Sequence, residues 1–247
     1  MKKKQHLSFS GYNGYLKCPQ KQYALDTGKF VFETTQAMIA GKYLEHLLCP
    51  KDLPVPEGVL TQKGEPYAWA KTMSEAAERI LANKFLKSFL VGKKQVEITF
   101  KLNGINWISI PDVVDYKSGK IVDIKKTKSI NEWSYSQEHG TRVPFWTERN
   151  YFLQLAIAQE AVFAETGKRF DCYLLAVSAE TPSQIAPIKF EQADLDYEID
   201  NLLYAQGTVY HQRSRGKNLW YCGECEFCRA NKPPEVIVAR RFANESN

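Results

Sequence analysis

The stretch between residues 95 and 126 constrains the fold most, because its apolar residues recur at every second position. Apolar side chains alternate with polar ones from Val96 to Phe100, which predicts a strand with one buried face. Asn103-Gly104 is a typical two-residue hairpin turn, so the chain is expected to return as a second strand. The three expected strands span 96–100, 105–116 and 121–126, with a polar turn over 117–120. The centre of the chain is therefore predicted to be a three-strand meander.

Helical periodicity surrounds this meander. Apolar residues recur at three- and four-residue spacing in 8–28, 33–48, 68–90, 147–165 and 192–212. Two further strands are expected over 170–177 and 185–190, and a loop over 127–146. The order α, β, β, β, α, β indicates an α/β fold with one mixed sheet flanked by helices. No Pro/Gly/Ser-rich linker interrupts it, so residues 1–247 are expected to form a single domain.

Composition narrows the class of protein. The 247 residues are 44% hydrophobic and 25% charged, which excludes a wholly disordered or fibrous chain. No apolar run approaches the roughly 20 residues that span a membrane, so we expect a cytoplasmic protein with no membrane partner. The formal charge of +5 suits either a nucleic acid partner or a solvated basic surface. The basic clusters are Lys117, Lys120, Lys125, Lys126 and Lys128, then Arg213, Arg215, Lys217, Arg229, Lys232, Arg240 and Arg241.

Two acidic residues and a lysine converge within the meander. Asp123 and Lys125 are two residues apart on one strand, so both side chains point to the same face. Asp112 precedes them on the neighbouring strand and can face Asp123 across the ladder. Aspartate is a poor strand former, so its recurrence here indicates more than an exposed hairpin. Carboxylates in this arrangement can hold Mg²⁺, which would lower the pKa of a bound water and stabilise charge on a phosphate.

The motif Pro111-Asp112 followed by Asp123-Ile124-Lys125 resembles the PD-(D/E)XK nuclease superfamily, whose core is an αβββαβ layer. The resemblance covers most of the chain and implies a restriction-endonuclease-like fold and a DNA nuclease that uses Mg²⁺ or Mn²⁺. In RecB-type members a helix supplies an early metal ligand, and Glu45 stands in that place with His46 one residue later; we take Glu45 as the ligand. Gln154 matches the glutamine that lies near the active site or the DNA in this superfamily.

Three of the six cysteines form a tight run, Cys222-x2-Cys225-x2-Cys228, which indicates a metal or cluster site in a chain of this kind. Cys18, followed by Pro19, resembles the opening of iron–sulfur RecB-type nucleases such as the CRISPR-adaptation and AddB nucleases. In those proteins one N-terminal and three C-terminal cysteines hold a [4Fe–4S] cluster that joins the two ends of the chain. The resemblance implies this role for Cys18, Cys222, Cys225 and Cys228, with Zn²⁺ as the alternative. Cys49 and Cys172 are expected to be free and buried.

These observations predict a metal-dependent exonuclease of the RecE-like, phage type, acting on DNA ends or single strands in recombination, repair or phage DNA metabolism. The alternative is a non-catalytic or partner-activated binding module of a recombination or CRISPR-adaptation complex. The intact set of two aspartates and one lysine favours the enzyme. The segment expected to be a loop could stack unpaired bases or pack against the core through Trp133, Tyr135, Phe145 and Trp146, with Arg142 and Arg149 close to them in the sequence.

Overall fold

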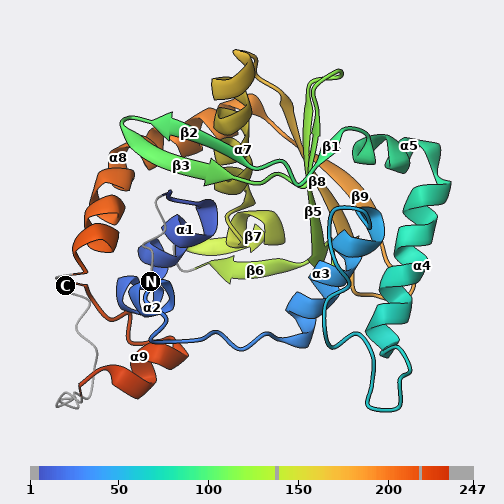
Figure 1. Cartoon of the computed structure of the whole chain (residues 1–247), viewed down its shortest axis with the longest axis horizontal. Helices are drawn as coiled ribbons and strands as arrows, with labels where there is room; N and C mark the ends of the chain where they lie inside the picture. The colour runs from blue at the N-terminus through green and yellow to red at the C-terminus, as the bar shows by residue number, and fades with distance from the viewer. Residues whose placement is uncertain (1–5, 137–138, 217–218, 234–247) are drawn as a thin grey trace.

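The computed structural model describes residues 6–136, 139–216 and 219–233, and its centre is a mixed five-stranded sheet (Figure 1). The strand order is β1-β4-β5-β8-β9. β5 and β8 run parallel, and every other neighbouring pair is antiparallel. The strands are β1 (Lys93–Lys94), β4 (Val113–Asp115), β5 (Lys120–Thr127), β8 (Asp171–Ser178) and β9 (Ile185–Phe190). The mixed α/β architecture predicted from the sequence is confirmed.

Helices cover both faces of the sheet, because successive residues of β5 point to opposite sides. Val122 and Ile124 pack with α3 and α4, whereas Ile121 packs with α1, α7 and α8. The helices of these two layers lie on opposite sides of β5 and β8 in Figure 1. Their bounds are α1 (Phe9–Lys17), α3 (Gln36–Leu48), α4 (Ala68–Ala82), α7 (Tyr151–Thr166) and α8 (Gln192–Arg215). In the described part of the chain, no helix combines the length and the apolar character needed to cross a membrane.

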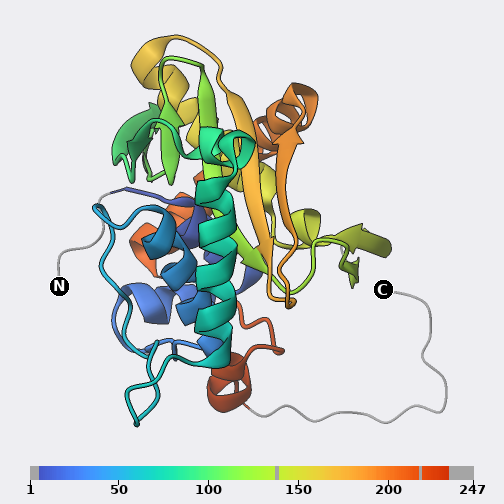
Figure 2. The same cartoon turned by 90° about the vertical axis from the view of Figure 1, so that its right-hand side faces the viewer.

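The remaining elements are short. They are α2 (Pro19–Asp26), α5 (Lys84–Lys87), the 3-10 helix η1 (Ser88–Leu90), β2 (Ile98–Leu102), β3 (Ile105–Ser109), β6 (Trp133–Ser136), β7 (Thr141–Pro144), α6 (Phe145–Glu148) and α9 (Glu226–Asn231). β2 and β3 form one separate antiparallel pair, and β6 and β7 form another. The β6–β7 pair projects from the body of the molecule in Figure 2.

The expected second strand, 105–116, is wrong as a single element. It divides into β3, which pairs with β2, and β4, which joins the main sheet. The break falls at Ile110-Pro111, where proline lacks an N–H for the ladder and restricts the residue before it. The meander is therefore a hairpin followed by a strand that moves into another sheet.

Two other predicted segments also differ. The expected loop over 127–146 contains β6, β7 and α6. The expected helix over 68–90 is interrupted at Asn83, whose side chain accepts hydrogen bonds from the backbone N–H groups of Phe85 and Leu86 and so starts a new helix.

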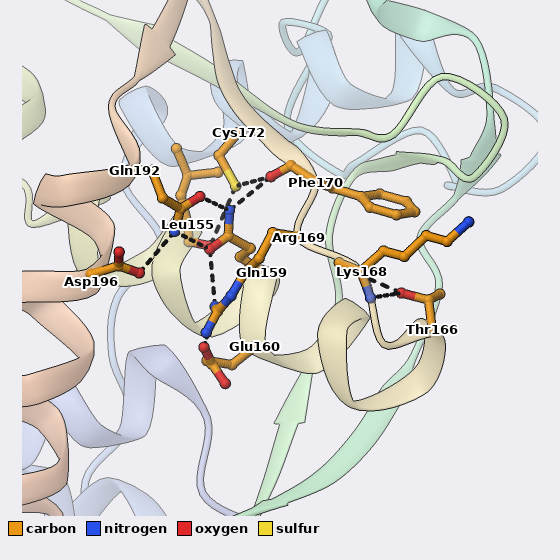
Figure 3. A network of polar contacts seen from close by, with 10 residues as sticks. All are labelled: Leu155, Gln159, Glu160, Thr166, Lys168, Arg169, Phe170, Cys172, Gln192 and Asp196. Atoms are coloured by element: carbon orange, nitrogen blue, oxygen red, sulfur yellow. Dashed lines mark hydrogen bonds and ion pairs between the residues drawn. The ribbon is translucent and has the colours of Figure 1, made fainter.

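A polar network around the buried Gln159 holds the second half of α7 in place (Figure 3). The Gln159 amide donates to the Phe170 carbonyl at 2.8 Å and pairs with the Gln192 amide at 2.9 Å. Arg169 contacts both Gln159 and Glu160. These contacts fix α7 to the start of β8 and to α8, which leaves the first half of α7 to face the functional site.

Candidate active site and cysteine centre

β5 supplies the centre of the site, because Asp123 and Lys125 lie on the face that α7 covers. The two side chains form an ion pair with an N···O distance of 2.5 Å. Asp123 is 5% exposed, whereas the Lys125 side chain is 21% exposed, so the carboxylate of the pair is withdrawn from water and the ammonium only partly. Burial alone would lower the pKa of the Lys125 ammonium, but the charges of Asp123 and Asp112 outweigh burial and raise it. Lys125 is therefore a cation at neutral pH.

Asp112 lies beside Asp123 because it directly precedes β4, whose first residue, Val113, pairs with Val122. β4 pairs with β5 only as far as Val113 opposite Val122. Beyond that pair, the backbone N–H of Ile124 donates to Asp112 Oδ2 at 2.7 Å, so a carboxylate takes the place of a strand carbonyl. Gln95 Nε2 donates to the other oxygen, Oδ1, also at 2.7 Å. The sequence reading did not identify Gln95, since no motif or spacing marks it.

Glu45 reaches the same cluster from α3, on the opposite face of the sheet. Burial, and then the negative charges of Asp112 and Asp123, raise its pKa to about 7, although Lys125 opposes this effect. His46 makes a different contact, since its Nδ1 lies 2.7 Å from the Leu53 carbonyl oxygen. Of the two residues considered as the early ligand, Glu45 is therefore the one whose charge interacts with the aspartates.

Gln154 and Tyr151 approach from the first half of α7. Gln154 Nε2 donates to Asp123 Oδ1 at 2.9 Å. The Lys125 ammonium lies 5.8 Å from the centre of the Tyr151 ring. Burial raises the pKa of Asp123 to about 6; Asp112 acts in the same direction and the Lys125 cation acts against both. The structure thus brings together Glu45, Asp112, Asp123, Lys125 and Gln154 from four separate segments.

The charges of this cluster fit a divalent cation. The pKa values of Glu45 and Asp123 are raised, first by burial and then by the charge of Asp112, and Lys125 acts against both shifts. Asp123 Oδ2 is buried and, among the described residues, accepts no hydrogen bond of ordinary geometry beside its ion pair. The carboxylate oxygens lie farther apart than the ligand atoms of a preformed metal site. Among the described residues, only a group of four cysteine thiols is gathered that closely. An ion between these carboxylates would keep water ligands, as Mg²⁺ usually does.

Two hollows border the carboxylates. One has a volume of about 510 Å³ and is lined by Asp123, Gln154, Ser109 and the start of α1. The other has a volume of about 730 Å³ and is lined by Glu45, Lys42 and the loop after α3. The cluster therefore borders open space both at Asp123 and at Glu45.

The four predicted cysteines meet at the ends of the described chain, between α2 and α9. Their sulfur atoms all lie within 4.8 Å of one another. The Sγ–Sγ distances are 3.3 Å for Cys18–Cys228, 3.7 Å for Cys222–Cys228 and 3.9 Å for Cys18–Cys225. Backbone N–H groups of Cys225 and Cys228 point at the sulfurs of Cys222 and Cys225 at 3.4 Å. All four are free thiols placed as a set of metal ligands.

The other residues singled out in the sequence have varied surroundings. Cys49 and Cys172 are buried and free, as expected. Phe145 packs in the main core, whereas Trp133 and Tyr135 are 53% and 66% exposed on the β6–β7 hairpin. The basic residues Lys217, Arg240 and Arg241 lie outside the described residues.

Comparison with known proteins identifies the class to which this fold and site belong. Residues 8–231 match the family described as a PDDEXK-like domain of unknown function (DUF3799), and the chain therefore belongs to that family. This assignment agrees with the PD-(D/E)XK resemblance of the Asp112, Asp123 and Lys125 motif. No curated protein matches the chain.

Two solved structures are similar to different degrees. A crystal structure described as a "Putative exonuclease" from Eubacterium rectale superposes with a TM-score of 0.85 at 23% identity, covering 95% of this chain and 91% of the other. The structure of SSO0001 gives a TM-score of 0.34 at 14% identity, covering 89% and 96%. The first comparison shows that the two chains share a fold.

Proposed function

We propose that the protein is a metal-dependent deoxyribonuclease that hydrolyses phosphodiester bonds at DNA ends or in single strands. One observation carries the proposal: Asp112, Asp123 and Lys125 meet with Glu45 and Gln154 at one buried cluster of a PDDEXK-family fold. A member of this family that only bound nucleic acid would have no need to keep all of these site residues. An exonuclease of this kind would serve recombination, repair or phage DNA metabolism in the cytoplasm, with a recombination protein as partner.

Each residue has a distinct part in this proposal. Asp112, Asp123 and Glu45 would hold Mg²⁺ or Mn²⁺, with the Ile124 carbonyl as a further ligand. When bound, the cation lowers the pKa of a water ligand and stabilises charge on the phosphate. Lys125 lies beside Asp123 and positions the attacking water.

The reaction is a hydrolysis at phosphorus. The water oxygen forms a bond to phosphorus and gives up one proton to solvent, while the P–O bond to the leaving sugar oxygen breaks and that oxygen takes up a proton from solvent. Gln154 keeps Asp123 in place through its hydrogen bond to Oδ1. It also lines the hollow in which the DNA strand would lie.

The β6–β7 hairpin supplies a surface for unpaired bases. Trp133 and Tyr135 are two residues apart, so both rings lie on one face of the hairpin. Arg142 is the cross-strand partner of Tyr135 and donates to the Trp133 carbonyl at 2.9 Å. Aromatic rings beside an arginine stack on bases of any sequence. In the sequence the hairpin lies between β5 and α7, which both supply residues of the catalytic cluster.

The cysteine centre holds either a [4Fe–4S] cluster or one Zn²⁺ ion, and its role is to join the two ends of the domain. The spacing of the cysteines in the sequence favours the cluster. The separations of the sulfur atoms favour zinc, since a tetrahedral ion with Zn–S bonds of about 2.3 Å has sulfurs about 3.8 Å apart. In a [4Fe–4S] cluster, each cysteine sulfur binds one iron atom from outside the cube. The four cysteine sulfurs therefore lie farther apart than around a single zinc ion. Visible absorbance and metal analysis after anaerobic purification distinguish the two.

The test of the proposed function is an anaerobic assay on end-labelled single- and double-stranded DNA with Mg²⁺, Mn²⁺ or no divalent metal. We expect metal-dependent cleavage that Asp123→Asn and Lys125→Met both abolish. Asp171→Asn is the matched control, because Asp171 also pairs with a lysine, Lys189 at 3.1 Å, but on the exposed surface. Absence of cleavage by folded, metal-loaded protein under every condition would replace the enzyme with the binding-module alternative.

A further inference from the structure

The edge of the sheet beside the candidate active site has an unusual construction. β1 is only two residues long, and it pairs with β4 immediately after the Asp112 position. Gly92, just before β1, has a φ of +128°, and a Cβ at this position would collide with the Val114 backbone. Only glycine permits the chain to approach β4 so closely here. Because the chain runs so close to β4 at Gly92, Gln95, three residues later, contacts Asp112.

Gln95 itself adopts a backbone conformation that side chains disfavour. Its φ is +48°, in the left-handed region where Cβ crowds the backbone. In this conformation, its N–H donates to the Asp112 carbonyl at 3.2 Å and its side-chain amide donates to Asp112 Oδ1 at 2.7 Å. A non-glycine residue held in this region by two contacts with one aspartate indicates a functional constraint.

We infer that Gln95 is a positioning residue that sets the orientation of the Asp112 carboxylate toward the metal. Ile124 N–H holds one oxygen and Gln95 Nε2 holds the other, so the carboxylate plane is fixed at both ends. Each oxygen keeps a second lone pair for a cation. The amide is neutral, so it fixes Asp112 without cancelling the negative charge that attracts the ion. The inference rests on the proposed function, because Asp112 must be a metal ligand for its orientation to matter.

Loss of the Gln95 amide should weaken metal binding more than it weakens the fold. Without it, Asp112 keeps one of its two side-chain hydrogen bonds, and its carboxylate can rotate about that bond. Partners that orient metal ligands typically account for about 10- to 100-fold in metal affinity or activity. We expect a shift of this size in the metal concentration needed for cleavage, with a smaller change in the rate at saturating metal.

The backbone of Gln95 allows this role to be separated from stability. Gln95→Gly removes the amide and also relieves the left-handed backbone, so the melting temperature should hold or rise while metal affinity falls. Gln95→Met keeps the size of the side chain but lacks the donor, and should weaken metal binding to the same extent. Asn103→Gly is the matched control, because Asn103 has a φ of +47° in the β2–β3 turn and makes no contact with the site among its described interactions.

The experiment measures Mn²⁺ binding by electron paramagnetic resonance without DNA, Mg²⁺ titration of DNA cleavage, and thermal melting, all on the full chain with its cysteine centre filled. The expected result is weaker Mn²⁺ binding by both Gln95 variants and unchanged binding by Asn103→Gly. Wild-type cleavage together with wild-type Mn²⁺ affinity in Gln95→Gly and Gln95→Met would overturn the inference and leave the nuclease intact. A wild-type protein that neither binds Mn²⁺ nor cleaves DNA would overturn both.

Discussion

Glu45 offers a direct test of the charge arrangement in the candidate active site through the effect of pH on stability. Its folded pKa is about 7, against an ordinary value of 4.5. The folded state therefore holds a proton more tightly than the unfolded state. The stability that this proton contributes is complete below pH 4.5 and is lost as pH rises through 7. Linkage gives a loss of about 2.5 kcal/mol between pH 5 and pH 8.

Glu45→Gln should remove this loss, since glutamine resembles the protonated acid at every pH. In metal-free buffer, the free energy of unfolding of the variant relative to wild type should increase by about 2.5 kcal/mol from pH 5 to pH 8. Urea denaturation at the two pH values measures the difference. Glu78→Gln, on the exposed face of α4, controls for the loss of one negative charge. At pH 8, Mg²⁺ should stabilise wild type more than Glu45→Gln.

The reasoning would be refuted by a stability difference that stays constant between pH 5 and pH 8. That result would mean that Glu45 is neither desolvated nor close to Asp112 and Asp123 in solution. Glu45 would then lose its place as a ligand. The DNA cleavage assay could still succeed, so the two experiments test separate parts of the site.

Three further predictions concern the rest of the molecule. Cys18→Ser should abolish retention of the metal through gel filtration, read by metal analysis, because it removes the ligand that links the two ends of the domain; full retention would exclude Cys18 as a ligand. Trp133→Ala with Tyr135→Ala should weaken single-stranded DNA binding in a gel shift by about 1–3 kcal/mol per lost stack, whereas Tyr204→Ala, which removes a 94% exposed ring on α8, should not. Gln159→Leu should destabilise the fold by roughly 1–3 kcal/mol in denaturant, because it takes the amide donor from the buried Phe170 carbonyl, and should leave cleavage per folded molecule unchanged.

Much of the fold could be predicted from local patterns, and the exceptions have identifiable causes. The two-residue periodicity before Thr127 gave the strands of the centre, but Pro111 should have divided the second one. The sequence Trp133-Ser134-Tyr135-Ser136 alternates as a strand does, yet its aromatic side faces solvent. The β6–β7 hairpin was therefore missed, because the prediction of strands assumed that their apolar side chains face the core.

The site was predictable only where its residues are close in the sequence. Asp123 and Lys125 share a face because they are two residues apart on one strand, and this holds wherever the strand lies. Gln95 meets Asp112 only because the backbone at Gly92 approaches β4 closely, which no local pattern encodes. Glu45 needed the family resemblance, since a single acidic residue on a helix gives no sign of what it faces.

The backbone of β5 explains why the acidic cluster forms at this position in the sheet. Buried N–H groups need partners, and the ladder between β4 and β5 stops at Val113 opposite Val122, so β4 supplies no carbonyl to Ile124. The Asp112 carboxylate meets this need and is thereby brought beside Asp123, where two like charges would otherwise separate. Glu45 approaches this point from α3 on one face of the sheet, and Gln154 approaches it from α7 on the other. The site therefore exists only when both helical layers are packed on the sheet, and any variant that loosens one layer should lose cleavage before it loses the strands.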